Sequence, residues 1–153
     1  MARSREFLYG AAVVGAIDFA YATLFVMYRG RPWYRPWQGV ASSVLGPASF
    51  TLGYKSALLG VLLHFTVATC IVGVYVMAAR LRPILRQNAL LWGLAYGAAA
   101  FFVMNLVVIP LTRIGRQPLT WSAFNIGGVI VHVLLLGPAA AYFGARAAGG
   151  SRS

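Results

Sequence analysis

Four long apolar runs limit what this chain can fold into more than any other feature. They extend over residues 7–28, 56–79, 89–111 and 121–143. Each has roughly 20 residues or a few more, enough for an α-helix to cross a hydrocarbon core about 30 Å thick. Because lipid offers no hydrogen-bond partners to backbone amides, each run is expected to be helical. The runs predict an all-α membrane fold, a four-helix transmembrane bundle formed by residues 1–153 as one domain.

The composition excludes the soluble classes of protein. Hydrophobic residues make up 60% of the 153 residues and charged residues only 10%, whereas a soluble domain has about a quarter charged residues. The apolar runs also lack the alternation of polar and apolar residues that a transmembrane β-barrel requires. The chain is therefore expected to use lipid as its solvent.

The net charge of +11, from 13 Lys+Arg against 2 Asp+Glu, does not indicate a nucleic-acid partner. Basic side chains that bind nucleic acid gather on one face, whereas here they stand in the breaks between apolar runs. That placement indicates contact with membrane lipids. Arg113 and Arg116 are candidates for binding a lipid phosphate or an anionic solute. The compact cluster of Arg80, Arg82 and Arg86 favours a cytoplasmic location for its loop and for both termini.

The first loop differs from the other two because it is long and rich in aromatic residues. Pro32 and Pro36 prevent the first helix from continuing. The segment 37–45 is predicted to form a short helix lying in the membrane interface. Interface anchors at the headgroup level are expected from Trp33, Tyr34, Trp37 and Trp121. At the other end of the chain, residues 147–153 are predicted to be a disordered tail.

A weak internal repeat relates the two halves of the chain. Tyr9-Gly10-Ala11-Ala12 recurs as Tyr96-Gly97-Ala98-Ala99, and Gly60-Val61-Leu62-Leu63-His64 resembles Gly128-Val129-Ile130-Val131-His132. Repeats of this kind are common in membrane proteins. The bundle is therefore predicted to consist of two similar helical hairpins, related by a pseudo-twofold axis along the membrane normal.

Four polar residues lie deep within the apolar runs, and we define them as the polar belt: Asp18, His64, Asn105 and His132. At 1.5 Å per residue they fall in the same half of the bilayer, within one or two helical turns of a common depth. They share helix faces with small residues, which mark tight helix contacts in membranes. A lipid-facing Asp would cost about 2.5–3.5 kcal/mol, so the belt is expected to face inward.

Three functions of the belt remain open. The favoured interpretation is polar glue between helices, which predicts a small structural or accessory membrane subunit, in a homo-oligomer or a larger membrane complex, and the other two functions are alternatives to it. It can belong to a pathway for protons or small solutes, because an intramembrane Asp beside imidazoles is typical of proton relays. It can also hold haem b, with His64 and His132 as the axial ligands.

No enzymatic chemistry is recognisable. The chain contains no nucleophile elbow, P-loop or zinc-protease motif. Cys70 is its only cysteine, so neither an intramolecular disulfide nor a Cys/His metal site is expected. Apart from haem, no cofactor is predicted.

Several segments between the first helix and the end of the third carry a resemblance to known sequences. They are Gly15-Ala16-Ile17-Asp18, Val40-Ala41-Ser42-Ser43-Val44-Leu45-Gly46, Ala57-Leu58-Leu59-Gly60-Val61-Leu62-Leu63-His64-Phe65 and Met104-Asn105-Leu106-Val107-Val108-Ile109-Pro110-Leu111. With them the chain resembles a group of short four-helix bacterial inner-membrane proteins of uncharacterised function. The resemblance implies a bacterial inner-membrane location and four crossings. It implies no activity and no catalytic residues.

Overall fold

The computed structural model describes residues 2–149, and every regular element in that range is a helix. Four helical stretches are long and apolar enough to cross a membrane: Ala2–Tyr28, Tyr54–Leu81, Ala89–Leu111 and Ala123–Ala148. The structure therefore agrees with the all-α class and with the four membrane-length helices that the apolar runs predict.

Each apolar run forms one of these stretches, and the third and fourth each contain a short π-helical segment. The elements in chain order are α1 (Ala2–Tyr28), α2 (Arg35–Leu45), η1 (Gly46–Phe50), α3 (Tyr54–Leu81), α4 (Ile84–Gln87), α5 (Ala89–Val103), η2 (Met104–Val108), η3 (Ile109–Leu111), α6 (Ala123–Val131), η4 (His132–Leu136) and α7 (Gly137–Ala148). The π-helical segments are η2 and η4. Polar side chains cap the N-termini of two helices: Asn88 caps α5, and Ser122 caps α6.

The C-terminal prediction needs correction. Ala147 and Ala148 belong to α7 and are buried, so the ordered chain extends past the point where the tail was expected to begin. Small residues pack closely at this helix end, which explains the difference. The remainder of the predicted tail, residues 150–153, lies outside the described residues.

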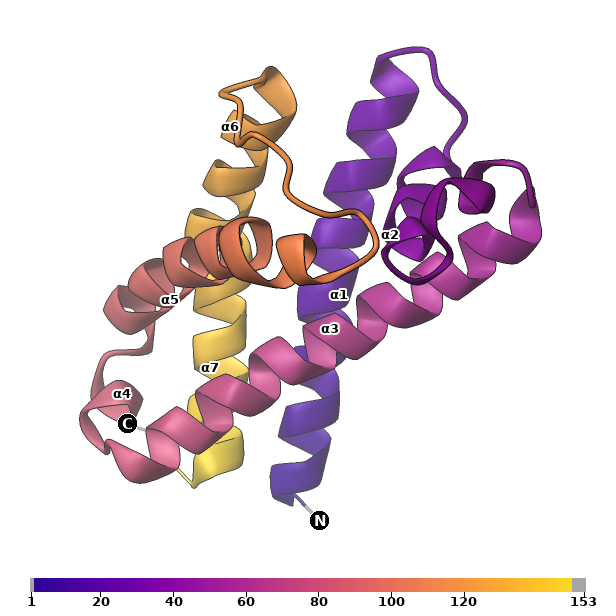
Figure 1. Ribbon diagram of the computed structural model, residues 1–153. Coiled ribbons are helices and arrows are strands. Elements are labelled where there is room, and N and C mark those ends of the chain that lie inside the picture. The colour runs from indigo at the N-terminus through magenta and orange to yellow at the C-terminus, as the bar shows by residue number, and fades with distance from the viewer. Residues whose placement is uncertain (1, 150–153) are drawn as a thin grey trace.

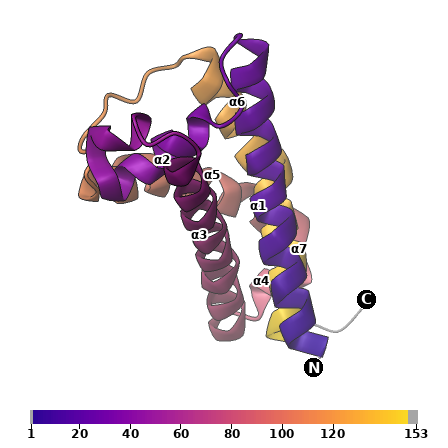
Figure 2. The same cartoon turned by 90° about the vertical axis from the view of Figure 1, so that its right-hand side faces the viewer.

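The beginning of α1 and the end of α7 lie at the same end of the molecule as α4, while α2 lies toward the opposite end (Figures 1 and 2). We call these the terminal end and the α2 end. Most of the buried core lies between α1, α3 and α7. Its best-buried side chains include Val14, Val72, Tyr75, Leu136 and Ala140.

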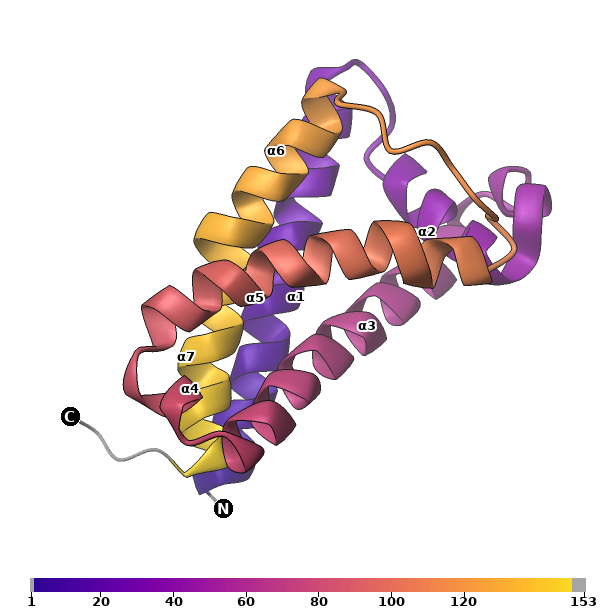
Figure 3. The same ribbon diagram turned by 60° about the vertical axis from the view of Figure 1, so that its left-hand side comes forward.

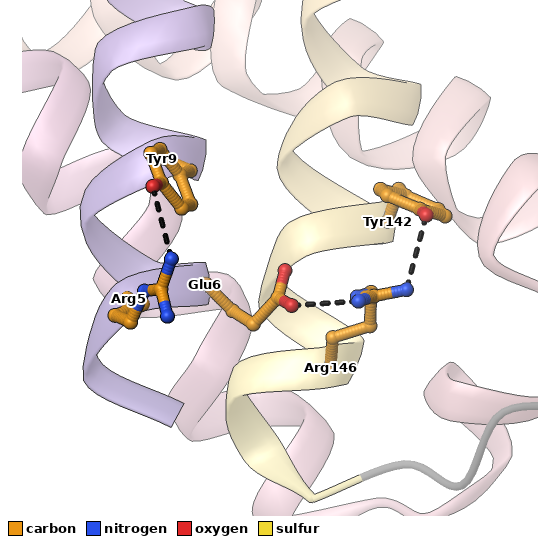
Figure 4. Close-up of polar contacts among 5 residues, drawn as sticks. All are labelled: Arg5, Glu6, Tyr9, Tyr142 and Arg146. Atoms are coloured by element: carbon orange, nitrogen blue, oxygen red, sulfur yellow. Dashed lines mark hydrogen bonds and ion pairs between the residues drawn. The ribbon is translucent and has the colours of Figure 1, made fainter. Parts of the chain in front are cut away.

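An ion pair joins α1 and α7 near the terminal end. Glu6 of α1 accepts a hydrogen bond of 2.6 Å from Arg146 of α7 (Figure 4). Arg146 also donates to the hydroxyl of Tyr142, at 3.1 Å. Both charged side chains are partly exposed, so we expect the pair to contribute at most about 1 kcal/mol to stability.

Glycines allow α5 to approach the fourth stretch very closely. A Cβ atom on Gly97 would overlap the His132 carbonyl, and one on Gly93 would lie 2.6 Å from the Cα of Pro138. From this contact α5 diverges from α6 and extends toward α2 (Figure 3). Helix α5 is thus in tight contact with the fourth stretch at Gly93 and Gly97, and the two separate beyond this contact.

Helix α2 is fixed between α1 and α3. A Cβ on Gly60 of α3 would overlap the carbonyl oxygen of Trp37, so only glycine permits this contact. Gln38 donates to the Gly53 carbonyl at 3.0 Å, and the Trp37 ring stacks on Phe19 of α1 with centroids 4.2 Å apart. These contacts make α2 part of the helix packing.

Candidate functional site

A cavity of about 770 Å³ lies where the helices diverge. Its walls come from α1, α2, α3, the α5–η2 region and the α6–η4 region. This volume falls within the range of about 300–1,000 Å³ that is typical of small-molecule sites. We call it the central cavity.

All four residues of the polar belt line the central cavity: Asp18, His64, Asn105 and His132. They come from four different membrane-length helices. The structure therefore brings together the side chains that the sequence singled out, and it supplies a space between them.

Asp18 and His64 face each other across α1 and α3. Asp18 Oδ2 lies 3.8 Å from His64 Nδ1, while His64 Nε2 lies 2.9 Å from the Gly15 carbonyl oxygen. A carbonyl only accepts, so Nε2 carries the proton of that bond. His64 is only 9% exposed and is enclosed by the rings of Phe19, Trp37 and Phe65. The imidazole is thus held rigidly beside the carboxylate.

Asn105 and His132 are oriented by their own helices. The Asn105 amide donates to the Phe101 carbonyl at 2.9 Å, and His132 Nδ1 donates to the Gly128 carbonyl at 2.9 Å. Both residues lie in π-helical segments, η2 and η4. Single π-helical turns are frequent at functional sites because they change the direction of a few side chains.

These bonds correct one interpretation of the belt. In residues 2–149 only His64 among the four belt residues forms a hydrogen bond to another membrane-length helix. Asn105 and His132 do not join helices, so polar glue does not explain their presence. Asn105 Oδ1 and His132 Nε2 form no hydrogen bond with any other atom of residues 2–149.

Trp37 also lines the central cavity, although the sequence suggested a headgroup anchor. Its side chain is 1% exposed and packs against His64 with ring centroids 5.0 Å apart. The position of α2 over Gly60 carries Trp37 into the interior, which is why the anchor prediction is wrong for this residue. Its indole Nε1 is buried and finds no acceptor among residues 2–149. Of the other predicted anchors, Trp33 and Trp121 are exposed and Tyr34 is half-buried.

At the α2 end, the cavity wall includes Arg29 and Arg31, both exposed. The sequence suggested Arg113 and Arg116 for contact with an anion, yet neither of them lines the cavity. Sequence reasoning overlooked Arg29 and Arg31 because a loop position does not reveal which helix end adjoins a cavity.

Both candidate haem ligands line the cavity, but the surroundings of His64 do not fit an axial ligand. Its Nε2 donates to Gly15, and an iron at that atom would have to displace this bond. Gly60, one turn before His64, is covered by the backbone of Trp37, which leaves no room for a porphyrin there. Among residues 2–149, no cluster of three or more His, Cys, Asp or Glu side chains could hold a metal ion.

Comparison with known proteins adds no further assignment. No protein-family model, curated protein or solved structure matches the chain. Function must therefore be inferred from the central cavity.

Proposed function

We propose that this multi-pass membrane protein binds a small membrane-soluble molecule in the central cavity. One observation carries the proposal: polar side chains from all four membrane-length helices line a single cavity of about 770 Å³. Burying such groups in a membrane is costly, and they usually mark a substrate or ion pathway. Because Asn105 and His132 do not join helices, binding accounts for them better than a structural role.

The setting of this function follows the sequence. We place the protein in a bacterial inner membrane with both termini in the cytoplasm, formed from two similar hairpins and with α2 near the membrane interface. Membrane lipids are its immediate partners. A second copy of the chain or a larger membrane complex is a further partner. Binding could serve transport, storage or delivery of the molecule to such a partner.

A pair of substitutions on α3 tests the proposal. Val67 lines the cavity, whereas Val74 is 59% exposed on the outer surface of the helix. Val67→Phe should fill part of the cavity, and Val74→Phe adds the same bulk where it would face lipid. The protein is placed in nanodiscs and mixed with a panel of neutral alkylphenols, alkylquinones and fatty alcohols, and thermal unfolding is followed.

A ligand at about one hundred times its Kd stabilises the folded state by about 2.7 kcal/mol. We expect at least one compound to raise the unfolding temperature saturably in the wild type and in Val74→Phe, with little effect on Val67→Phe. If no compound distinguishes the wild type from Val67→Phe, the proposal is wrong.

The Asp18–His64 contact supports a second candidate, a proton-coupled pathway. A carboxylate and an imidazole 3.8 Å apart in a cavity are suited to passing a proton. In proteoliposomes under an imposed potential, proton flux should then exceed that of empty vesicles and disappear with Asp18→Asn. Equal flux through wild type and variant would exclude this role.

A further inference from the structure

We propose that the ligand of the central cavity is a neutral aromatic alcohol, a phenol or hydroquinone, with its hydroxyl group between Asp18 and the neighbouring polar groups. This inference rests on the proposed function and adds the chemical class of the molecule. It follows from the hydrogen-bond donors and acceptors that line the cavity and have no partner in the described chain.

Several unused polar atoms of the belt are acceptors. No hydrogen bond from residues 2–149 reaches the Asp18 carboxylate, and His64 Nδ1 lies 3.8 Å from it. Asn105 and His132 each spend one N–H group on their own helix, which leaves the Asn105 carbonyl oxygen and, in the neutral ring, the His132 Nε2 lone pair as acceptors. A ligand that satisfies these acceptors must donate hydrogen bonds.

Unused donors are present as well. The Asn105 amide keeps a second N–H group beyond the one given to Phe101. The indole N–H of Trp37 is buried without an acceptor in the described chain, and Trp37 lines the same cavity. A hydroxyl group both donates and accepts, whereas an ammonium group only donates, and a quinone carbonyl or a carboxylate only accepts. Among these small groups, the hydroxyl alone matches both needs.

Charge favours a neutral molecule. Arg29 and Arg31 line the α2 end of the cavity and the chain has a net charge of +11, which disfavours entry of a cation. Deeper in the cavity the Asp18 carboxylate disfavours an anionic group. An uncharged hydroxyl meets neither obstacle.

The walls favour an aromatic ring with an apolar tail. Tyr21 and Phe25 of α1 meet Phe124 of α6, with ring centroids 5.5 and 5.2 Å from it. All three rings line the cavity, and aromatic surfaces favour offset or edge-on contact with another ring. Along α1, Asp18 and Arg29 are about 16 Å apart at helical rise. A wall that is largely apolar separates them, so a tail extending from the ring has a place.

The test compares matched compounds by calorimetry on the protein in nanodiscs. The probes are para-nonylphenol, its methyl ether, which keeps the ring and tail but loses the donor, and decylamine. A second pair is decylhydroquinone and the corresponding decylquinone. We expect the phenol to bind at least about tenfold more tightly than its ether, because a site built to hydrogen-bond a hydroxyl strongly rejects the analogue without it. The hydroquinone should likewise exceed the quinone.

Two variants locate the hydroxyl. Asp18→Leu should bring the phenol-to-ether affinity ratio close to one. Trp37→Phe, which keeps a ring against Phe19 but loses the indole donor, should weaken binding of both compounds severalfold and leave the ratio near that of the wild type, because both oxygens accept. If Asp18→Leu fails to fold, Asp18→Asn is used, and its ratio should fall between those of the wild type and one. Val74→Phe serves as the control and should keep the wild-type ratio.

The outcomes separate this inference from the function on which it rests. If the ether binds as tightly as the phenol, or if the amine or the quinone binds more tightly, the aromatic-alcohol assignment is wrong while cavity binding stands. The same holds if the ratio survives Asp18→Leu. If no probe binds saturably, both proposals fail.

Discussion

Asp18 and Glu6 are the only acidic residues of the chain, and the structure places them in different surroundings. Glu6 forms an ion pair with Arg146 near the terminal end (Figure 4). Asp18 lines the central cavity, where His64 Nδ1 lies 3.8 Å from its carboxylate. A carboxylate in an apolar run without a hydrogen bond from residues 2–149 is expected to gain little stability from its neighbours, which supports the proposed role in binding.

Replacing each acid by leucine distinguishes these roles. We expect Asp18→Leu to raise the free energy of unfolding, on the order of 1 kcal/mol, because a poorly satisfied polar group leaves an apolar setting. It should also weaken binding of the phenol probe to about the level of its methyl ether. Thermal or denaturant unfolding in detergent micelles measures the first effect and calorimetry measures the second.

Glu6→Leu is the matched control. It removes one partner of an ion pair, so the free energy of unfolding should fall by up to about 1 kcal/mol while binding persists. A loss of stability in Asp18→Leu equal to that in Glu6→Leu would show that Asp18 is a structural residue.

At the level of helices, glycine contacts decide where the elements cross. Gly60 lies directly against the backbone of Trp37, and Gly97 lies against the backbone of His132. Each contact fixes a helix that carries cavity residues, α2 in the first case and η4 in the second. Gly73, by contrast, has only one side-chain atom nearby, at 3.8 Å.

The substitutions Gly60→Ala and Gly73→Ala test whether a glycine contact fixes the position of α2. Gly60→Ala should displace α2 and lower the free energy of unfolding by about 1–3 kcal/mol, the usual cost of overpacking. Gly73→Ala sits on the same helix with room for its methyl group and should leave stability unchanged or slightly higher. Equal stability of the two variants, measured by circular dichroism during unfolding, would contradict the described position of α2.

The π-helical segments have an identifiable cause in nearby prolines. Pro110 lies in η3, directly after η2, and Pro138 lies at the start of α7, after η4. Proline lacks an N–H and crowds the carbonyl four residues earlier, so a regular helix cannot continue through it unchanged. In η4 the Gly137 N–H bonds instead to the His132 carbonyl, five residues before it.

Pro138→Ala should let η4 relax toward a regular α-helix and change the direction of His132. We expect affinity for the phenol probe to fall at least severalfold with no loss of helix content, as measured by calorimetry and circular dichroism. Pro47→Ala, in the exposed part of η1 away from the cavity, is the control and should bind normally. Wild-type affinity in Pro138→Ala would show that the π-helical turn does not shape the site.

The molecule is tightly packed between α1, α3 and α7, whereas α5 diverges from α6 (Figure 3). Residues of α1, α2, α3, the α5–η2 region and the α6–η4 region line the central cavity. The two described ends of the chain lie together, as an even number of crossings requires (Figures 1 and 2). The central cavity reaches toward the α2 end, where Arg29 and Arg31 line it. If the termini lie in the cytoplasm, as proposed, that end faces the opposite side of the membrane.

Cysteine labelling tests this topology. In a Cys70→Ala background, Ser4→Cys near the terminal end and Gln117→Cys in the loop before α6 each place one thiol at an exposed position. A membrane-impermeant maleimide added to intact cells should label Gln117→Cys and spare Ser4→Cys, with both labelled after permeabilisation. Labelling of Ser4→Cys alone would reverse the orientation, and labelling of both in intact cells would exclude four crossings.

The sequence by itself determined the class of fold, the four membrane-length helices and the identity of the polar residues within them. These depend on hydropathy and on how unlikely a polar side chain is in lipid, which are properties of short stretches of chain. The tertiary structure alone decided that Asn105 and His132 bond to their own helices and that Trp37 is an interior donor. It also decided that a cavity lies between the belt residues. Those features arise from where helices far apart in sequence cross at Gly60 and Gly97, and close packing between distant segments leaves no periodic pattern in either segment alone.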